Sequence, residues 1–159
     1  MFHIILFNPE IPPNTGNIMR LCSNTGSNLH LIKPLGFDLN SKNLKRAALD
    51  YSEISNSKVY DSLEDCFSEN KFNNIFAITK FGKENLFSLK FDIDDAFLFG
   101  NETSGLPSEI LNSFTAKYKL RIPMKKQNRS LNLSNAASIV LYEAWRQNNF
   151  KSAEISFNG

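Results

Sequence analysis

The sequence predicts one α/β domain, with a mostly parallel sheet covered by helices on both faces. Short apolar runs typical of buried strands alternate along the chain with helical patterns, which is the order that parallel sheets require. The 159 residues suit one domain of ordinary size, and 42% hydrophobic with 21% charged residues is typical of a globular protein. Because no repeat or linker divides the chain, we expect a single domain over residues 1–159, with a loose tail at 150–159.

Strands are expected where short apolar runs end at proline, glycine or polar residues. They are predicted at 2–7, 28–32, 58–60, 74–79, 96–99 and 118–122. Helices are expected between these strands, at 15–23, 41–49, 61–70, 107–113 and 133–147. Asn14 is placed to cap the first helix, and Ser62 with Asp65 resembles a capping box before the third.

Ligands of such sheets bind beyond the carboxyl ends of the strands, so polar loops after strands are candidate sites. The first such loop, residues 8–20, is stiffened by prolines and leads into a helix at Asn14, Thr15 and Gly16. A helix N-terminus favours an anion, and Arg20 follows one to two turns later. The plainer alternative is a rigid connection that carries a surface arginine.

The second loop, residues 99–107, contains Gly100 and Gly105, which allow the backbone to turn sharply and approach a ligand. Glu102 is its one ionisable side chain. The glycine spacing matches neither the dinucleotide-binding fingerprint nor the P-loop. The loop therefore predicts a ligand site without naming the ligand.

The third loop, residues 122–135, is basic in its first half and rich in hydroxyl and amide groups in its second. Ser130, Asn132 and Ser134 lead into the last helix, where such groups cap a helix or bind a base or ribose. The formal net charge of +2 excludes a generic polycation. Six basic residues nevertheless fall close together with no acidic residue among them: Lys117, Lys119, Arg121, Lys125, Lys126 and Arg129. Such a stretch is either a solvated face or a contact for phosphates.

Cysteine and histidine usage predicts neither a disulfide framework nor a metal site. Cys22 and Cys66 share no ligand spacing with each other or with a histidine. His3 and His30 are isolated within apolar runs, which indicates strand histidines rather than ligands. No apolar stretch is long enough to cross a membrane or to form a signal peptide, so we expect a cytoplasmic protein.

Three segments in order resemble the motifs of the SPOUT RNA 2′-O-ribose methyltransferases. They are NTGNIMRLC at 14–22, FGNETSGLP at 99–107 and IPMKKQNRSLNLSN at 122–135. The continuation YEAWRQ at 142–147 narrows the resemblance to the members that methylate the wobble nucleotide, cytidine or carboxymethylaminomethyl-uridine, of leucine tRNAs. The resemblance covers nearly the whole chain. The sequence departs from it at Ala48, which replaces a glycine, at Asn101, which replaces a proline, and at Ser104, which replaces a basic residue.

The resemblance implies a C-terminal deep trefoil knot and S-adenosylmethionine as methyl donor, with S-adenosylhomocysteine as product and no metal. Carried over by position, the cofactor contacts are Ile78, Gly100, Ile122, Met124, Ser130 and Leu131. The implied catalytic residue is Arg20, assisted by Asn14, Glu102 and Asn132. A homodimer is implied, with RNA or dimer contacts at Tyr142, Arg129, Lys125, Lys126 and Arg46.

Three other functions are compatible with parts of the sequence. A related methyltransferase of another tRNA or rRNA ribose would have the same catalytic loops. A non-catalytic RNA-binding domain is disfavoured by the intact set of Arg20, Glu102, Ser130 and Asn132. A nucleotide-using oxidoreductase is disfavoured because the dinucleotide fingerprint is missing.

Overall fold

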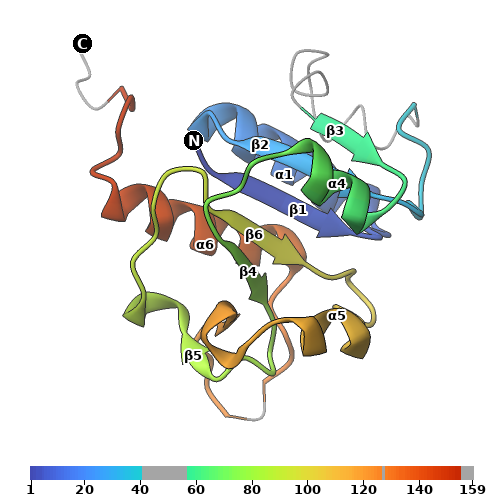
Figure 1. Cartoon of the computed structure of the whole chain (residues 1–159). Coiled ribbons are helices and arrows are strands. Elements are labelled where there is room, and N and C mark those ends of the chain that lie inside the picture. The colour runs from blue at the N-terminus through green and yellow to red at the C-terminus, as the bar shows by residue number, and fades with distance from the viewer. Residues whose placement is uncertain (41–56, 127, 155–159) are drawn as a thin grey trace.

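Seven parallel strands form one sheet in the order β3-β2-β1-β6-β4-β7-β5 (Figure 1). The computed structural model describes residues 1–40, 57–126 and 128–154. The strands are β1 (His3–Phe7), β2 (Asn28–Ile32), β3 (Ser57–Tyr60), β4 (Ile75–Ile78), β5 (Glu84–Asn85), β6 (Ala96–Phe99) and β7 (Lys119–Arg121). The predicted α/β class is confirmed, with all six expected strands present. The two-residue β5 was not expected, because its residues are polar and too few to form a pattern.

The helices cover both faces of the sheet, α1 and α6 on one face and α4 and α5 on the other (Figure 1). They are α1 (Pro12–Thr25), α4 (Leu63–Glu69), α5 (Ser108–Ser113) and α6 (Leu133–Gln147), with two 3-10 turns, η1 (Leu86–Ser88) and η2 (Ala116–Tyr118). The helix expected at 41–49 lies outside the described residues. The trefoil knot stays a prediction.

The central strands are buried on both faces, as a parallel sheet between two helix layers requires. Ile4 and Leu6 of β1 face the α1 and α6 layer, whereas Ile5 faces the α4 and α5 layer. One stripe of α6 is buried in the same core. Its fully buried residues follow helical spacing and are Ala137, Val140, Leu141 and Ala144.

The predicted cap of the first helix was wrong. The helix begins two residues earlier than Asn14, at Pro12, and Ile11 occupies the N-cap position without a side-chain hydrogen bond. Proline fits the first turn because it needs no hydrogen bond from its nitrogen. Asn14 therefore lies inside the helix, and its side chain is available for other contacts.

The cap predicted for the helix now labelled α4 is partly confirmed. Ser62 Oγ accepts a hydrogen bond from Asp65 N at 3.0 Å. A full capping box would direct the Asp65 carboxylate to the Ser62 backbone N–H. Here the Ser62 hydroxyl instead donates to that carboxylate at 2.7 Å.

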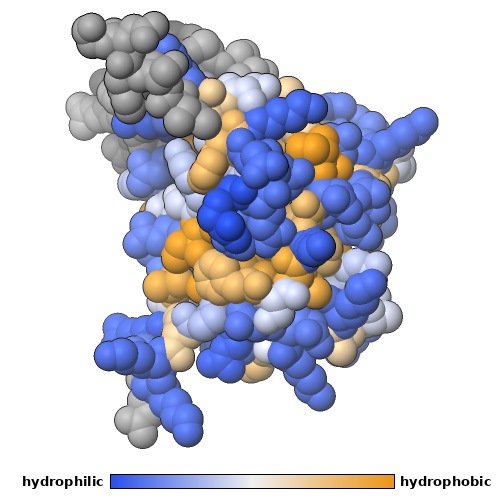
Figure 2. All heavy atoms as spheres, turned by 90° about the vertical axis from the view of Figure 1, so that its left-hand side faces the viewer, coloured by the Kyte–Doolittle hydropathy of each residue, from blue (hydrophilic) through white to orange (hydrophobic). Residues whose placement is uncertain are grey.

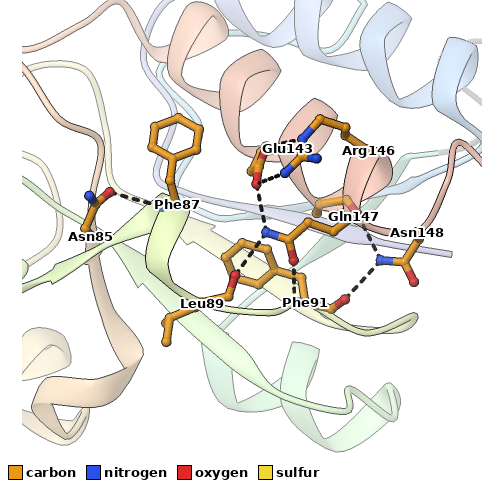
Figure 3. A network of polar contacts seen from close by, with 9 residues as sticks. Asn85, Phe87, Leu89, Phe91, Glu143, Arg146, Gln147 and Asn148 are labelled. Carbon is orange, nitrogen blue, oxygen red and sulfur yellow. Dashed lines mark hydrogen bonds and ion pairs between the residues drawn. The ribbon is translucent and has the colours of Figure 1, made fainter.

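Side-chain amides at the end of α6 bind the backbone that precedes β6 (Figure 3). Gln147 Oε1 accepts from Phe91 N, and its Nε2 donates to Leu89 O, both at 2.9 Å. Asn148 Nδ2 donates to Phe91 O at 2.9 Å. These bonds anchor the η1–β6 connection to the last helix.

The first residues of the expected loose tail are held against α6. The Phe150 ring lies 5.4 Å from the Trp145 ring, centroid to centroid. Trp145 Nε1 donates a hydrogen bond to Lys151 O at 3.1 Å. Residues that contact α6 therefore extend beyond position 150, where composition predicted that the loose tail begins.

The two histidines lie in strands, as predicted, but they are not isolated in space. His3 Nδ1 lies 3.0 Å from His30 Nε2, and His30 Nδ1 lies 3.0 Å from Tyr60 Oη. Asn70 Nδ2 donates to the same hydroxyl at 2.9 Å. Burial lowers the pKa of His30 to about 4, so the histidine pair is neutral at physiological pH.

The free cysteines Cys22 and Cys66 are both buried, and burial raises the pKa of each thiol to about 12. Such thiols are poor nucleophiles at neutral pH. Within the described ranges, no helix is both long enough and apolar enough to cross a membrane.

Candidate active site

The loops that follow β1, β4, β6 and β7 surround one cavity of about 480 Å³. These strands run parallel, so the loops leave the same edge of the sheet. The volume is in the range of small-molecule sites. All three loops singled out from the sequence reach this cavity. A fourth loop, residues 78–81, also lines the cavity. It was not among the loops predicted from the sequence, although polar residues directly after the apolar strand pointed to it.

All six residues predicted to contact a cofactor line the cavity: Ile78, Gly100, Ile122, Met124, Ser130 and Leu131. Gly100 is required by close backbone approach. A Cβ at this position would lie 2.0 Å from the carbonyl carbon of Gly105 and 2.1 Å from the nitrogen of Leu106. Any side chain there would force the two ends of the loop apart.

Glu102 joins the β6–α5 loop to the beginning of α1. Its Oε2 accepts a hydrogen bond from Glu10 N at 2.8 Å, and its Oε1 accepts from Ile11 N at 3.1 Å and from Asn14 Nδ2 at 3.1 Å. The carboxylate thus satisfies backbone donors at the start of a helix, where a negative charge is favourable. This contact places Asn14 at the cavity wall.

Asn132 extends the same network to the third loop. Its Nδ2 donates to Asn14 Oδ1 at 2.9 Å, while its Oδ1 accepts from Ser134 N at 2.9 Å and caps α6. Asn14 therefore donates to Glu102 on one side and accepts from Asn132 on the other, which fixes the orientation of its amide. Three segments far apart in the sequence are tied together at one wall of the cavity.

The two departures in the second motif form a turn with each other. Asn101 Oδ1 accepts hydrogen bonds from Thr103 N at 3.2 Å, from Ser104 N at 2.7 Å and from the Ser104 hydroxyl at 2.9 Å. An asparagine that binds the backbone two residues on is a standard way to stiffen a turn. The loop here is held by side-chain hydrogen bonds, without the proline and the basic residue of the motif.

The structure does not place Arg20 at the cavity wall. Arg20 is half-buried on α1, six residues beyond Asn14, a separation of about 9 Å along the helix axis. Tyr142 is 46% exposed on α6 and also lies outside the cavity lining. Arg46 lies outside the described residues.

The remaining predicted RNA contacts are three basic residues that follow β7. Lys125, Lys126 and Arg129 are all exposed. They lie in the stretch between the lining residues Met124 and Ser130. The basic part of the third loop is therefore a solvent-exposed border of the cavity.

Comparisons with known proteins indicate the class of protein to which this chain is similar. A tRNA (cytidine(34)-2′-O)-methyltransferase from Methylovorus glucosotrophus (strain SIP3-4) is 53% identical over 153 residues, which are 96% of this chain and 99% of that protein. A solved structure that concerns the 2-OH methylation of C/U34 on tRNA has a TM-score of 0.87 at 41% identity, covering 95% of this chain and 98% of that one. An AdoMet-bound rRNA methyltransferase from Sinorhizobium meliloti has a TM-score of 0.76 at 25% identity, covering 91% of this chain and 56% of that one.

The fold is therefore that of a methyltransferase. More particularly, the sequence profile of the SpoU rRNA Methylase family matches residues 1–142, and the chain belongs to that family.

Proposed function

We propose that this protein transfers a methyl group from S-adenosylmethionine to the 2′-hydroxyl of the wobble nucleotide of tRNA, with leucine tRNAs as substrates. The observation that carries the proposal is the Glu102–Asn14–Asn132 network, which unites the three motif loops at one cavity. The relative from Methylovorus glucosotrophus, which matches 96% of the chain, supports the choice of the wobble cytidine.

The cavity fits S-adenosylmethionine in size and in the chemistry of its walls. Met124 and Leu131 provide apolar surface for the adenine ring, and the loop closed at Gly100 offers backbone groups at close range. Ser130 provides a polar group for the ribose of the cofactor. When bound, the cofactor supplies a methyl group already activated on a sulfonium.

The substrate contributes an alcohol, which is a poor nucleophile and needs assistance. In the transfer, the 2′-oxygen forms a bond to the methyl carbon, the bond from that carbon to sulfur breaks, and the hydroxyl proton leaves to solvent. We assign Arg20, which lies on α1 beyond the cavity wall, either to hold the target phosphate or to stabilise the negative charge that develops on the oxygen, because a guanidinium stays protonated and cannot act as a base. Asn14 and Asn132 orient the ribose, and Glu102 keeps their loops together.

Two surface features support a homodimer that binds RNA. Figure 2 shows a band of hydrophobic residues across the face that carries α6 and η1, bordered by hydrophilic residues. Large apolar side chains on or next to α6 are exposed, Tyr142 at 46% and Leu131 at 39%. Burial of this band against a second copy, through α6 and the proposed knot, would bring two basic borders to one RNA.

Methylation of total tRNA from a strain that lacks the gene tests the reaction. We expect the labelled methyl group on the wobble ribose of leucine tRNAs. Label at another tRNA nucleotide would contradict the substrate, and the absence of any labelled tRNA would contradict the reaction.

The role of Arg20 is tested separately. Arg20→Ala is expected to lower turnover by about 100- to 10,000-fold with an unchanged Kd for the cofactor. Arg146→Lys, which keeps an ion pair with Glu143 on α6, serves as the arginine control. If Arg20→Ala methylates tRNA as fast as the wild type does, Arg20 has no role in the reaction.

A further inference from the structure

The exposed ring of Phe81 stands at the rim of the cavity and has no role in the proposed chemistry. At 67% exposure it is the most exposed of the large hydrophobic side chains in the part of the chain that the structure describes. It also lines the cavity, so it borders the site where the ribose is methylated. An apolar ring left in water beside a substrate site is available for a ligand.

The loop that carries Phe81 is short and closely held against the sheet. Thr79 N donates to Leu120 O at 2.9 Å, Gly82 N donates to Thr79 O at 3.1 Å, and Phe81 N donates to Thr79 Oγ1 at 3.2 Å. A Cβ on Gly82 would lie 2.5 Å from the carbonyl carbon of Leu120, so the turn touches the backbone of β7 directly. The backbone that carries the ring is therefore fixed before any ligand binds, which lowers the entropic cost of binding.

Basic side chains lie close to the ring and along the neighbouring strands. Lys80 Nζ lies 5.1 Å from the centre of the Phe81 ring. Arg121, which is exposed, lines the same cavity, and Lys83 and Lys119 directly precede the paired residues Glu84 and Leu120 of β5 and β7. The half-buried Glu84 is the acidic residue that follows Lys83. This surface would repel a second copy of itself, but it complements a polyanion.

An aromatic ring among cations is the arrangement by which proteins bind single-stranded nucleic acid. Bases stack on the ring while Lys and Arg contact the phosphates. A wobble nucleotide lies in the single-stranded anticodon loop, so its neighbouring bases are free to stack. We propose that Phe81 stacks on a base of the anticodon loop next to the methylated nucleotide and so positions the ribose over the cavity. This inference rests on the proposed function.

Binding of tRNA to the full-length protein, with S-adenosylhomocysteine present, tests the stacking contact. Phe81→Ala is expected to raise the Kd for tRNA by about 5- to 150-fold, the value of one stacked base. Phe81→Leu is expected to lose most of the same affinity, because it keeps the apolar volume but not the aromatic face. Phe81→Tyr should bind as the wild type does.

Two controls separate stacking from other causes. Ile93→Ala removes another exposed apolar side chain, which does not line the cavity, and should leave the Kd for tRNA unchanged. Phe81→Ala should not change the slope of log Kd against log salt concentration, whereas Lys80→Ala should reduce that slope by about 1. The Kd of each variant for S-adenosylmethionine is expected to stay within about twofold of the wild type, since the ring lies at the rim.

A fluorescence signal reports the contact directly. The chain has a single tryptophan, so Phe81→Trp combined with Trp145→Phe puts the only indole at the rim. Addition of tRNA should quench its emission.

Three results would overturn the proposal: an unchanged tRNA Kd in Phe81→Ala, wild-type binding in Phe81→Leu, or weaker cofactor binding with tRNA binding intact. If the wild-type protein methylates no tRNA, the proposed function fails. If it does and Phe81→Ala behaves as the wild type, only the stacking inference fails.

Discussion

Two polar networks in this molecule are built alike and do different things. At the carboxyl edge of the sheet, Glu102, Asn14 and Asn132 join three loops and line a cavity. Under the α4 layer, His3, His30 and Tyr60 join three strands, and each is at most 8% exposed. The first network presents polar atoms to a ligand, whereas the second satisfies polar atoms within the core.

The polar contacts of the histidine network form a continuous chain from β1 to β3. Asn28 Nδ2, which can only donate, lies 3.5 Å from His3 Nδ1; with that nitrogen as acceptor, His30 Nε2 carries the hydrogen between the two rings. His30 Nδ1 then accepts from the Tyr60 hydroxyl, which in turn accepts from Asn70. Every ring nitrogen between these strands has a partner, as buried polar groups require.

The comparison shows that residue type is a poor guide to the role of a polar side chain. Histidine is the usual choice for acid–base work, yet both histidines here are structural. Asparagine and glutamate in the loops line the site because the strands before them end at the same edge. Four experiments test this division, ordered from the largest expected effect to the smallest.

Gly100→Ala should abolish cofactor binding. Its Cβ would lie 2.0 Å from backbone atoms of Gly105, and backbone has no alternative rotamer, so the loop must open. Calorimetric titration with S-adenosylmethionine should show at least a 100-fold rise in Kd, on the order of 3 kcal/mol. The control is Gly105→Ala, which meets nothing within 4 Å but has a φ of +72° and should cost only about 1 kcal/mol of stability. Unaltered binding in Gly100→Ala would show that the closed loop is not part of the site.

Glu102→Gln should lower both stability and turnover. The amide replaces one of two acceptor oxygens, so it faces backbone donors of Glu10 or Ile11 with an N–H group. We expect a loss of about 2 kcal/mol in the free energy of unfolding, measured with urea, and slower methylation. Glu109→Gln, on the exposed side of α5, is the matched control. Equal effects from the two variants would contradict the special role of the cavity network.

Acidification should destabilise the protein through the histidine network. Burial holds the pKa of His30 at about 4, below its value of 6.5 when exposed, so the unfolded chain binds the proton more tightly. The stability that His30 provides is therefore present above pH 6.5 and is lost as the pH falls from 6.5 to about 4. Between pH 7 and pH 5 we expect a loss of about 2 kcal/mol.

Other charged groups near the pair act in both directions. Burial also lowers the pKa of His3, and the N-terminal ammonium adds to this effect, while Asp94 raises the pKa. Lys58 lowers the pKa of His30. Urea unfolding at several pH values measures the sum. Constant or rising stability between pH 7 and pH 5 would refute the neutral histidine pair.

Tyr60→Phe should have the smallest effect. It removes the hydroxyl between His30 and Asn70 and should cost about 1 kcal/mol of stability, the net value of a buried hydrogen bond. Methylation rates and cofactor binding should not change, because the residue lies outside the lining of the active-site cavity. A slower enzyme with normal stability would mean that the two networks are coupled.

Much of the site was predictable because its residues lie in short motifs that begin where strands end. All six predicted cofactor residues line one cavity, and Asn14, Glu102 and Asn132 meet there as expected from the resemblance. The pairing of Asn101 with Ser104 was not predictable from a motif that has other residues at both positions. The loop of Phe81 was missed because its role depends on contact with β7, which lies about 40 residues away in sequence.

By itself the sequence determined the α/β class, six of the seven strands and the bounds of the last helix, since buried runs and helical spacing are local properties of the chain. Tertiary structure decided which polar residues face a ligand and which face each other. His3 and His30 meet because β1 and β2 pair in register, and Asn14 reaches Glu102 because β1 and β6 are neighbours. Such contacts depend on the order of strands in the sheet, and no local pattern contains that order.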